Sequence, residues 1–125
     1  MGGSEKLLTA LELKVMNILW DLKHAFVKEI KGKWPEEPMP AYNTISTMVR
    51  ILEEKGYVGH ESFGRSYRYF PKISRVQYQK KLLGSVLDNA FSGSLSSLVS
   101  TLVEGRELSE GEVAELKDLI ENSDP

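Results

Sequence analysis

Residues 41–57 read AYNTISTMVRILEEKGY, and this stretch decides the fold. Apolar residues recur in it at helical spacing, which predicts a helix that packs on one side through Ile45, Met48, Val49 and Leu52. Polar side chains repeat the same spacing on nearly the opposite side, at Asn43, Ser46, Thr47 and Arg50. Gly56 supplies the left-handed residue that ends such a helix.

The polar side of this helix differs from an ordinary solvated face. A solvated face usually contacts only water and carries many Glu and Lys side chains. This one carries Ser, Thr, Asn and Arg, which are the side chains that reach base edges and phosphates in DNA complexes. Contact with water and contact with DNA are therefore the two alternatives, and the flanking sequence favours the second.

The sequence before this helix predicts two more helices. Thr9-Ala-Leu-Glu12 matches a capping box, so a helix begins there, with its buried face at Leu11, Val15, Met16, Ile18, Leu19, Trp20 and Leu22. A short helix from about Phe26 to Trp34 follows. Pro35, Pro38 and Pro40 end it and make the turn into residues 41–57.

After Gly56 the hydrophobic period changes from 3.6 to 2. Residues 57–62 and 67–70 are predicted to form two short strands, joined by Phe63-Gly64-Arg65-Ser66, in which Gly64 suits a positive φ. Three helices followed by a small hairpin form a winged helix, a helix-turn-helix variant. Its third helix enters the major groove of DNA and the hairpin, or wing, flanks the duplex.

Residues 74–122 predict three further helices that cannot cover their own apolar side chains. Ser74-Arg-Val-Gln77 and Ser109-Glu-Gly-Glu112 are capping boxes, and Ser92-Gly93-Ser94 separates the first helix from the second. Leaving many Leu and Val side chains in water is costly, and a second copy of the same segment would cover them. The prediction is a homodimer, against the alternative of a monomer whose tail packs on the winged helix. The expected dimerisation residues are Val86, Leu87, Phe91, Leu95, Leu98, Val99, Leu102, Leu116, Leu119 and Ile120.

Composition excludes several classes of protein. The 125 residues include no cysteine, so disulfides, thiolate metal sites and cysteine nucleophiles are absent. There is no apolar run long enough for a membrane span and no signal peptide, which predicts a soluble, cytoplasmic protein without membrane insertion. His24 and His60 lack metal-ligand spacing, and no catalytic motif or phosphate-binding glycine loop is present. We therefore expect no enzyme activity, no metal and no cofactor.

The two halves of the chain differ in charge. Residues 1–72 carry 11 Lys and Arg against 9 Asp and Glu, a net of +2, and residues 73–125 carry 5 against 9, a net of −4. A mildly basic front and an acidic back fit a DNA-reading part joined to a part with another role.

The winged-helix prediction assigns roles to individual side chains. Asn43, Ser46, Thr47 and Arg50 would read bases, because Arg can bridge guanine O6 and N7 and Asn can pair with adenine. Lys55, Arg65 and Arg68 would contact phosphates. The alternative is a protein-interaction module without sequence-specific DNA binding, in which the polar helix face meets another polypeptide.

Four separated stretches resemble the BlaI/MecI penicillinase repressor family, which also includes CopY-type members. They are LTALELKVMNILW at 8–20, YNTISTMVRILEEKG at 42–56, GRSYRY at 64–69 and LSEGEVAEL at 108–116. The resemblance covers residues 7–121 in collinear order. It implies a bacterial transcriptional repressor that binds a palindromic operator as a homodimer.

The resemblance also implies a domain organisation and further site residues. The expected fold is mainly α with a small β-hairpin: a winged helix-turn-helix DNA-binding domain at 7–72, then a C-terminal helical dimerisation region at 73–122, with flexible ends at 1–6 and 123–125. In the recognition helix it adds Tyr42 and Thr44 to the DNA-binding residues, and in the wing it adds Ser66.

Two departures from the family pattern concern regulation. CopY-type members sense copper through a C-terminal cysteine cluster, which this chain lacks. Penicillinase repressors are inactivated by a regulatory protease that cuts an Asn-Phe bond in the dimerisation region. Thr101-Leu102 takes the place of that bond here.

Overall fold

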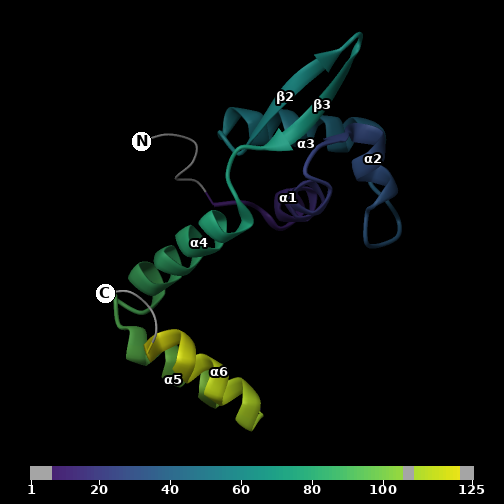
Figure 1. Cartoon of the computed structure of the whole chain (residues 1–125). Helices are drawn as coiled ribbons and strands as arrows, with labels where there is room; N and C mark the ends of the chain where they lie inside the picture. The colour runs from purple at the N-terminus through teal and green to yellow at the C-terminus, as the bar shows by residue number, and fades with distance from the viewer. Residues whose placement is uncertain (1–6, 106–108, 122–125) are drawn as a thin grey trace. The chain divides into compact units, whose positions relative to one another are not determined.

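A computed structural model of the chain describes residues 7–105 and 109–121. The chain divides into two compact units, residues 1–82 and residues 83–125. The flexible ends expected at 1–6 and 123–125 lie outside the described residues. The first unit contains the three helices and the hairpin predicted from the sequence, and the second contains the C-terminal helices (Figure 1).

Helix α1, Ala10–Leu22, begins at the predicted capping box. The Thr9 hydroxyl accepts a hydrogen bond from the Glu12 amide, and the Glu12 carboxylate accepts one from the Thr9 amide. The prediction of a buried Leu11 was wrong: its side chain is 51% exposed, whereas Glu12 is buried. The carboxylate can be buried because it also meets a lysine from a distant helix, which helical periodicity does not reveal.

Helix α2, Val27–Gly32, is shorter than predicted at both ends: Phe26 lies in a strand, and the helix ends at Gly32, before Trp34. Strand β1, Ala25–Phe26, pairs antiparallel with β3, so Phe26 lies opposite Arg68. This two-residue strand was not predicted. Its formation depends on a partner about forty residues away, and two residues show no alternation by themselves.

Helix α3, Tyr42–Glu54, confirms the helix predicted from residues 41–57. Its four predicted inward residues, Ile45, Met48, Val49 and Leu52, are all buried. Gly56 follows with φ +88°, the left-handed conformation expected where the helix ends.

The hairpin consists of β2, Val58–Phe63, and β3, Ser66–Pro71. Phe63 pairs with Ser66, so the turn is only Gly64 and Arg65, with Gly64 at φ +61°. A glycine with positive φ at the first turn position is the requirement of a type II′ hairpin turn. The sheet order is β1-β3-β2. The hairpin extends beyond the three helices (Figure 1).

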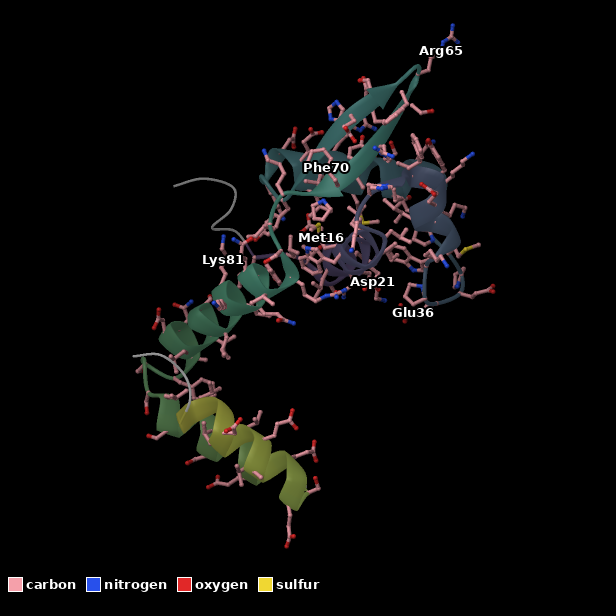
Figure 2. All side chains as sticks on the ribbon, viewed as in Figure 1. Met16, Asp21, Glu36, Arg65, Phe70 and Lys81 are labelled. Atoms are coloured by element: carbon pink, nitrogen blue, oxygen red, sulfur yellow. The ribbon has the colours of Figure 1, made fainter. Side chains whose placement is uncertain are left out.

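The core of the first unit lies where α1, α2 and α3 meet the base of the sheet. Met16 lies among the helices, whereas the far end of the hairpin has no helix beside it (Figure 2). Tyr57, Val58 and Tyr69 carry the core from the helices into the sheet, and all three are buried.

The first turns of α4, Arg75–Ala90, belong to this same unit. Tyr78 is buried, with its ring edge-on to Tyr57 at 5.8 Å and tilted against Trp20 at 6.1 Å. Its hydroxyl accepts a hydrogen bond from the Leu8 amide. The first compact unit therefore runs to Leu82, because Tyr78 and Leu82 pack on its core.

The second unit contains the rest of α4, α5 at Leu95–Gly105 and α6 at Glu110–Glu121. The capping boxes predicted at Ser74 and Ser109 are both formed. None of the side chains of α5 is buried. Among the expected dimerisation residues, Leu95 and Leu102 are exposed and Val86, Leu87, Phe91, Leu98 and Val99 are half-buried. The side chains of Leu116, Leu119 and Ile120 lie outside the described ones.

Candidate DNA-binding surface

The polar side of α3 is the first component of the candidate site. Asn43, Thr44, Thr47 and Arg50 are exposed, and Tyr42 is 53% exposed. Within the described residues Arg50 makes a single, long hydrogen bond in its own helix, 3.4 Å from its Nε to the Ser46 carbonyl oxygen. The helix is thus held by its apolar side, and its hydrogen-bonding side is not covered by the described part of the chain.

The wing supplies the second component. Arg65 stands at the tip of the hairpin and points away from the body of the unit (Figure 2). No ion pair to Arg65 is formed within residues 7–105 and 109–121. Ser66 beside it is also exposed. A cation at this position can meet a backbone phosphate without first giving up a protein partner.

Arg68, also expected to contact phosphate, is engaged within the wing. Its Nη2 donates to the Glu61 carboxylate at 2.9 Å across the two strands, and its guanidinium lies 4.6 Å from the centre of the Phe63 ring. Its Nε is buried without a hydrogen-bond partner. These contacts neutralise much of its charge, so Arg68 contributes less positive field than Arg65.

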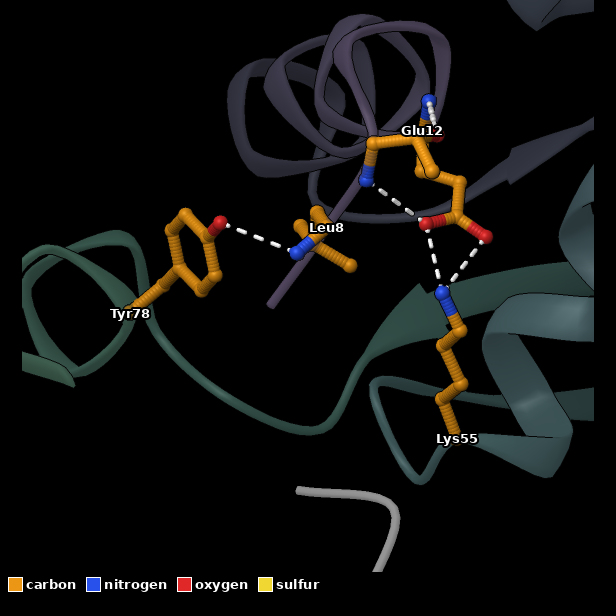
Figure 3. A network of polar contacts seen from close by, with 5 residues as sticks. Leu8, Glu12, Lys55 and Tyr78 are labelled. Atoms are coloured by element: carbon orange, nitrogen blue, oxygen red, sulfur yellow. Dashed lines mark hydrogen bonds and ion pairs between the residues drawn. The ribbon is translucent and has the colours of Figure 1, made fainter. Parts of the chain in front are cut away.

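Lys55, the third expected phosphate ligand, faces inward. Its ammonium donates to both oxygens of Glu12, at 2.7 and 2.9 Å, and its side chain is 19% exposed (Figure 3). Burial alone would raise the pKa of Glu12, but the hydrogen bonds from Lys55 and Thr9 outweigh it and lower that pKa. This contact ties the last turn of α3 to the first turn of α1, and it leaves Lys55 poorly placed to meet DNA.

A second tie joins the wing to α3. His60 Nδ1 lies 2.7 Å from the Glu53 carboxylate, and the His60 ring stacks on Tyr67 at 4.4 Å. The Tyr69 ring lies 5.9 Å from that of His60, and burial raises the pKa of the Tyr69 phenol. No role was predicted for His60, because it meets Glu53 only when β2 packs beside α3.

An open groove separates the wing from the beginning of α3. Its volume is about 420 Å³, and Val27 and Lys28 of α2 contribute to its walls. Its walls combine aromatic rings, hydroxyls and two cations, without a carboxylate. The residues that line it are Phe26, Val27, Lys28, Tyr42, Ser46, Phe63, Arg65, Ser66, Tyr67 and Tyr69. Phe26 was predicted to face inward on the second helix, and Lys28 was given no role. A lysine on a short helix gives no signal by itself, since solvated lysines are common.

Neither a metal site nor a membrane span is found in the described part of the chain. No three His, Asp or Glu side chains there are grouped so that they could hold a metal ion. Among the same residues, no helix combines the length and the apolar character needed to cross a bilayer.

The comparisons with known proteins agree on one family. Residues 8–122 match the family model described as penicillinase repressor. The penicillinase repressor of Bacillus licheniformis is 30% identical over 88% of this chain and 86% of that protein. The methicillin resistance regulatory protein MecI of Staphylococcus aureus (strain N315) is 25% identical over 90% of this chain and 92% of that protein.

A solved structure supports the fold assignment. The solution structure of the DNA binding domain of the repressor BlaI matches with a TM-score of 0.50 and 28% identity, over 57% of this chain and 87% of that domain. The predicted winged helix with a mainly α composition is thereby confirmed.

Proposed function

The chain belongs to the penicillinase repressor family, and on this premise we propose that it represses transcription by occupying a palindromic operator as a homodimer. The members it matches are regulators and repressors rather than enzymes, as the absence of catalytic motifs in the sequence led us to expect. The observation that carries the proposal is the exposed polar side of α3, with Asn43, Thr47 and Arg50 uncovered while the opposite side is buried.

Base reading belongs to α3 in this proposal. With the helix in the major groove, Arg50 can donate to both acceptors of guanine, and Asn43 can pair with adenine. Tyr42, Thr44, Ser46 and Thr47 extend the contact along the helix. The wing then meets the backbone through Arg65 and Ser66, in a winged-helix variant of the helix-turn-helix docking geometry. Lys55 and Arg68 are not principal phosphate ligands in this proposal, because they already form ion pairs with Glu12 and Glu61.

Homodimerisation follows from the apolar surface of the second unit. Leu83, Leu95, Leu102 and Val103 are 37–54% exposed in the single chain. Large apolar side chains exposed in this number favour an interaction surface, and a second copy of the same helices offers a matching apolar surface to cover them. A two-fold dimer presents two copies of α3, so the operator would be palindromic. The repressor would act in the cytoplasm and hinder polymerase by occupying the promoter.

The operator is released when the two protomers separate or when the intact dimer loses its hold on the DNA. Thr101-Leu102, at the place of the family's Asn-Phe cleavage bond, lies inside α5. A regulatory protease acting there would need α5 to open locally, since a protease reaches a helical peptide bond through its opened state. Cleavage would separate the wing and α3 from part of the dimerisation region.

Selection of bound duplexes from a random pool tests the proposal. We expect a palindrome with half-sites about one or more helical turns apart. Binding should weaken steeply as salt rises, and sedimentation at micromolar protein should give the mass of two chains. A monomer in solution would remove the operator symmetry. Recovery of no sequence, together with salt-insensitive binding to a polypeptide, would instead establish the protein-interaction alternative.

A further inference from the structure

The groove between the wing and α3 lies where one DNA strand would pass. If α3 occupies the major groove, the backbone at the edge of that groove runs beside the helix, and Arg65 stands on the far side of it. The space between Ser46 on α3 and Ser66 on the wing is this groove, about 420 Å³ in volume and open to solvent. A strand reaching both Arg65 and the beginning of α3 therefore runs along it.

The chemistry of the groove fits a sugar–phosphate chain. Lys28 and Arg65 supply positive charge, and no carboxylate lines the walls. Ser46, Ser66 and Tyr42 bring hydroxyls, which are common donors to phosphate oxygens. Tyr67 is 48% exposed and offers an aromatic surface to a deoxyribose. An apolar small molecule would leave these polar groups without partners, whereas a phosphodiester chain satisfies them.

Lys28 is the residue that this arrangement adds. It is exposed, and it makes no ion pair within the described ranges 7–105 and 109–121. Its neighbour on the same helix, Lys31, is already used, because its ammonium donates to the Pro40 carbonyl at 2.9 Å. Lys33 is exposed at the other end of α2 and does not line the groove.

We propose that the groove between the wing and α3 seats the sugar–phosphate backbone of one DNA strand, with Lys28 and Arg65 as phosphate ligands on the same strand. This inference rests on the proposed DNA binding. It differs from a wing that merely rests on the outside of the duplex, because it places the strand between wing and helix and brings α2 into the contact.

The test compares Lys28→Ala with Lys33→Ala in the full-length chain. The two substitutions remove equal charge from the two ends of one helix. Binding is measured over a range of salt on a duplex selected from a random pool and on a scrambled duplex of equal length. Lys28→Ala should weaken both about 5- to 20-fold and reduce the steepness of the log–log salt dependence by about 0.9 for each phosphate that the protein no longer neutralises. Lys33→Ala should change the affinity less than about twofold. Unchanged thermal midpoints confirm folding.

Phosphate ethylation interference then locates the contacts. We expect ethylation of one phosphate to weaken DNA binding by the unsubstituted protein but not by Lys28→Ala. Ethylation of a nearby phosphate on the same strand should weaken DNA binding by the unsubstituted protein but not by Arg65→Ala. Equal behaviour of Lys28→Ala and Lys33→Ala, or sensitive phosphates on opposite strands within one half-site, overturns the groove assignment. Failure of the unsubstituted protein to bind either duplex at low salt would instead refute the proposed function, so the two failures are distinguishable.

Discussion

Glu12 and Lys55 form a buried ion pair between the beginning of α1 and the end of α3 (Figure 3). Glu12 also caps α1 through the Thr9 amide. One carboxylate therefore caps α1 and also ties it to the end of α3. Removing one partner of such a pair leaves the other charge buried without compensation.

We expect Lys55→Met to lower the free energy of unfolding by about 2 kcal/mol at pH 7. Methionine keeps the apolar stem of lysine but leaves Glu12 unpaired. Lys14→Met is the matched control, because Lys14 pairs with Glu36 at the surface and exposed pairs contribute below about 1 kcal/mol. Denaturant titration of both variants measures the difference, and equal destabilisation would contradict a special role for the buried pair.

The same pair predicts a pH dependence of stability. The pKa of Glu12 is lowered in the folded chain, so the unfolded chain binds the proton more tightly. The stabilisation is complete above the ordinary glutamate pKa of about 4.3 and is lost as pH falls from there through the folded value. Acid titration of Lys55→Met should show a shallower fall in this window than the unsubstituted protein. A parallel fall in both proteins would assign the acid sensitivity to other carboxylates.

Arg50 and Arg65 are expected to contribute differently to binding. Arg50→Ala should cost about 1–3 kcal/mol on the selected duplex and little on a scrambled one, because alanine cannot hydrogen-bond to the base. Arg65→Ala should weaken both duplexes alike, because it removes a phosphate ligand. Gel-shift titration on the two duplexes separates the cases. Identical patterns for the two variants would refute this division between α3 and the wing.

At the scale of the element, α3 depends on how it ends. Gly56 has φ +88°, so the chain can leave the helix and enter β2 directly. A side chain at this φ clashes with the backbone, at a cost of about 1–2 kcal/mol. The turn from α3 into β2 therefore depends on a residue that can adopt this φ.

Gly56→Ala should therefore lower the free energy of unfolding by about 1–2 kcal/mol. Gly32→Ala is the matched control: this glycine ends α2, and a Cβ built on it meets no other atom within 4 Å. Alanine is the better helix former, so the control should be neutral or more stable by up to about 1 kcal/mol. Thermal unfolding of both variants compares them. Destabilisation by Gly32→Ala of the same size would show that the φ of Gly56 is not the cause.

At the scale of the whole molecule, the two units have unequal cores. The first unit buries Met16, Leu19, Ile45 and other large side chains completely. In the second unit no side chain of α5 is buried. Apolar helices without a buried face gain stability by association. The second unit is thus the part of the chain whose stability we expect to depend on protein concentration.

Leu102→Glu should convert the proposed dimer into monomers at micromolar concentration, because it places a charge on the apolar side of α5. Operator affinity should then fall by about 100-fold or more, since the two half-sites are no longer bound by one linked pair of readers. Ser97→Glu is the control, as Ser97 is exposed and lies on the opposite side of the same helix. Sedimentation measures the mass of each variant in solution, and DNA titration measures its affinity for the operator. A dimeric Leu102→Glu protein would exclude this face of α5 from the interface.

The sequence alone determined the parts of this protein that depend on neighbouring residues. The inward face of α3, the three capping boxes and the positive φ of Gly56 and Gly64 were all predicted, because helical periodicity, caps and turns involve residues at most a few positions apart. The family was also predicted, since four separated stretches carry its pattern.

Tertiary structure alone decided which distant residues meet. Burial of Glu12 requires Lys55, strand β1 requires β3, and the core position of Tyr78 requires Tyr57 and Trp20. The groove that includes Lys28 likewise exists only when α2, α3 and the wing come together. A side chain's charge and period are local properties, but its partner depends on how the whole chain packs, so these features could not be deduced from spacing.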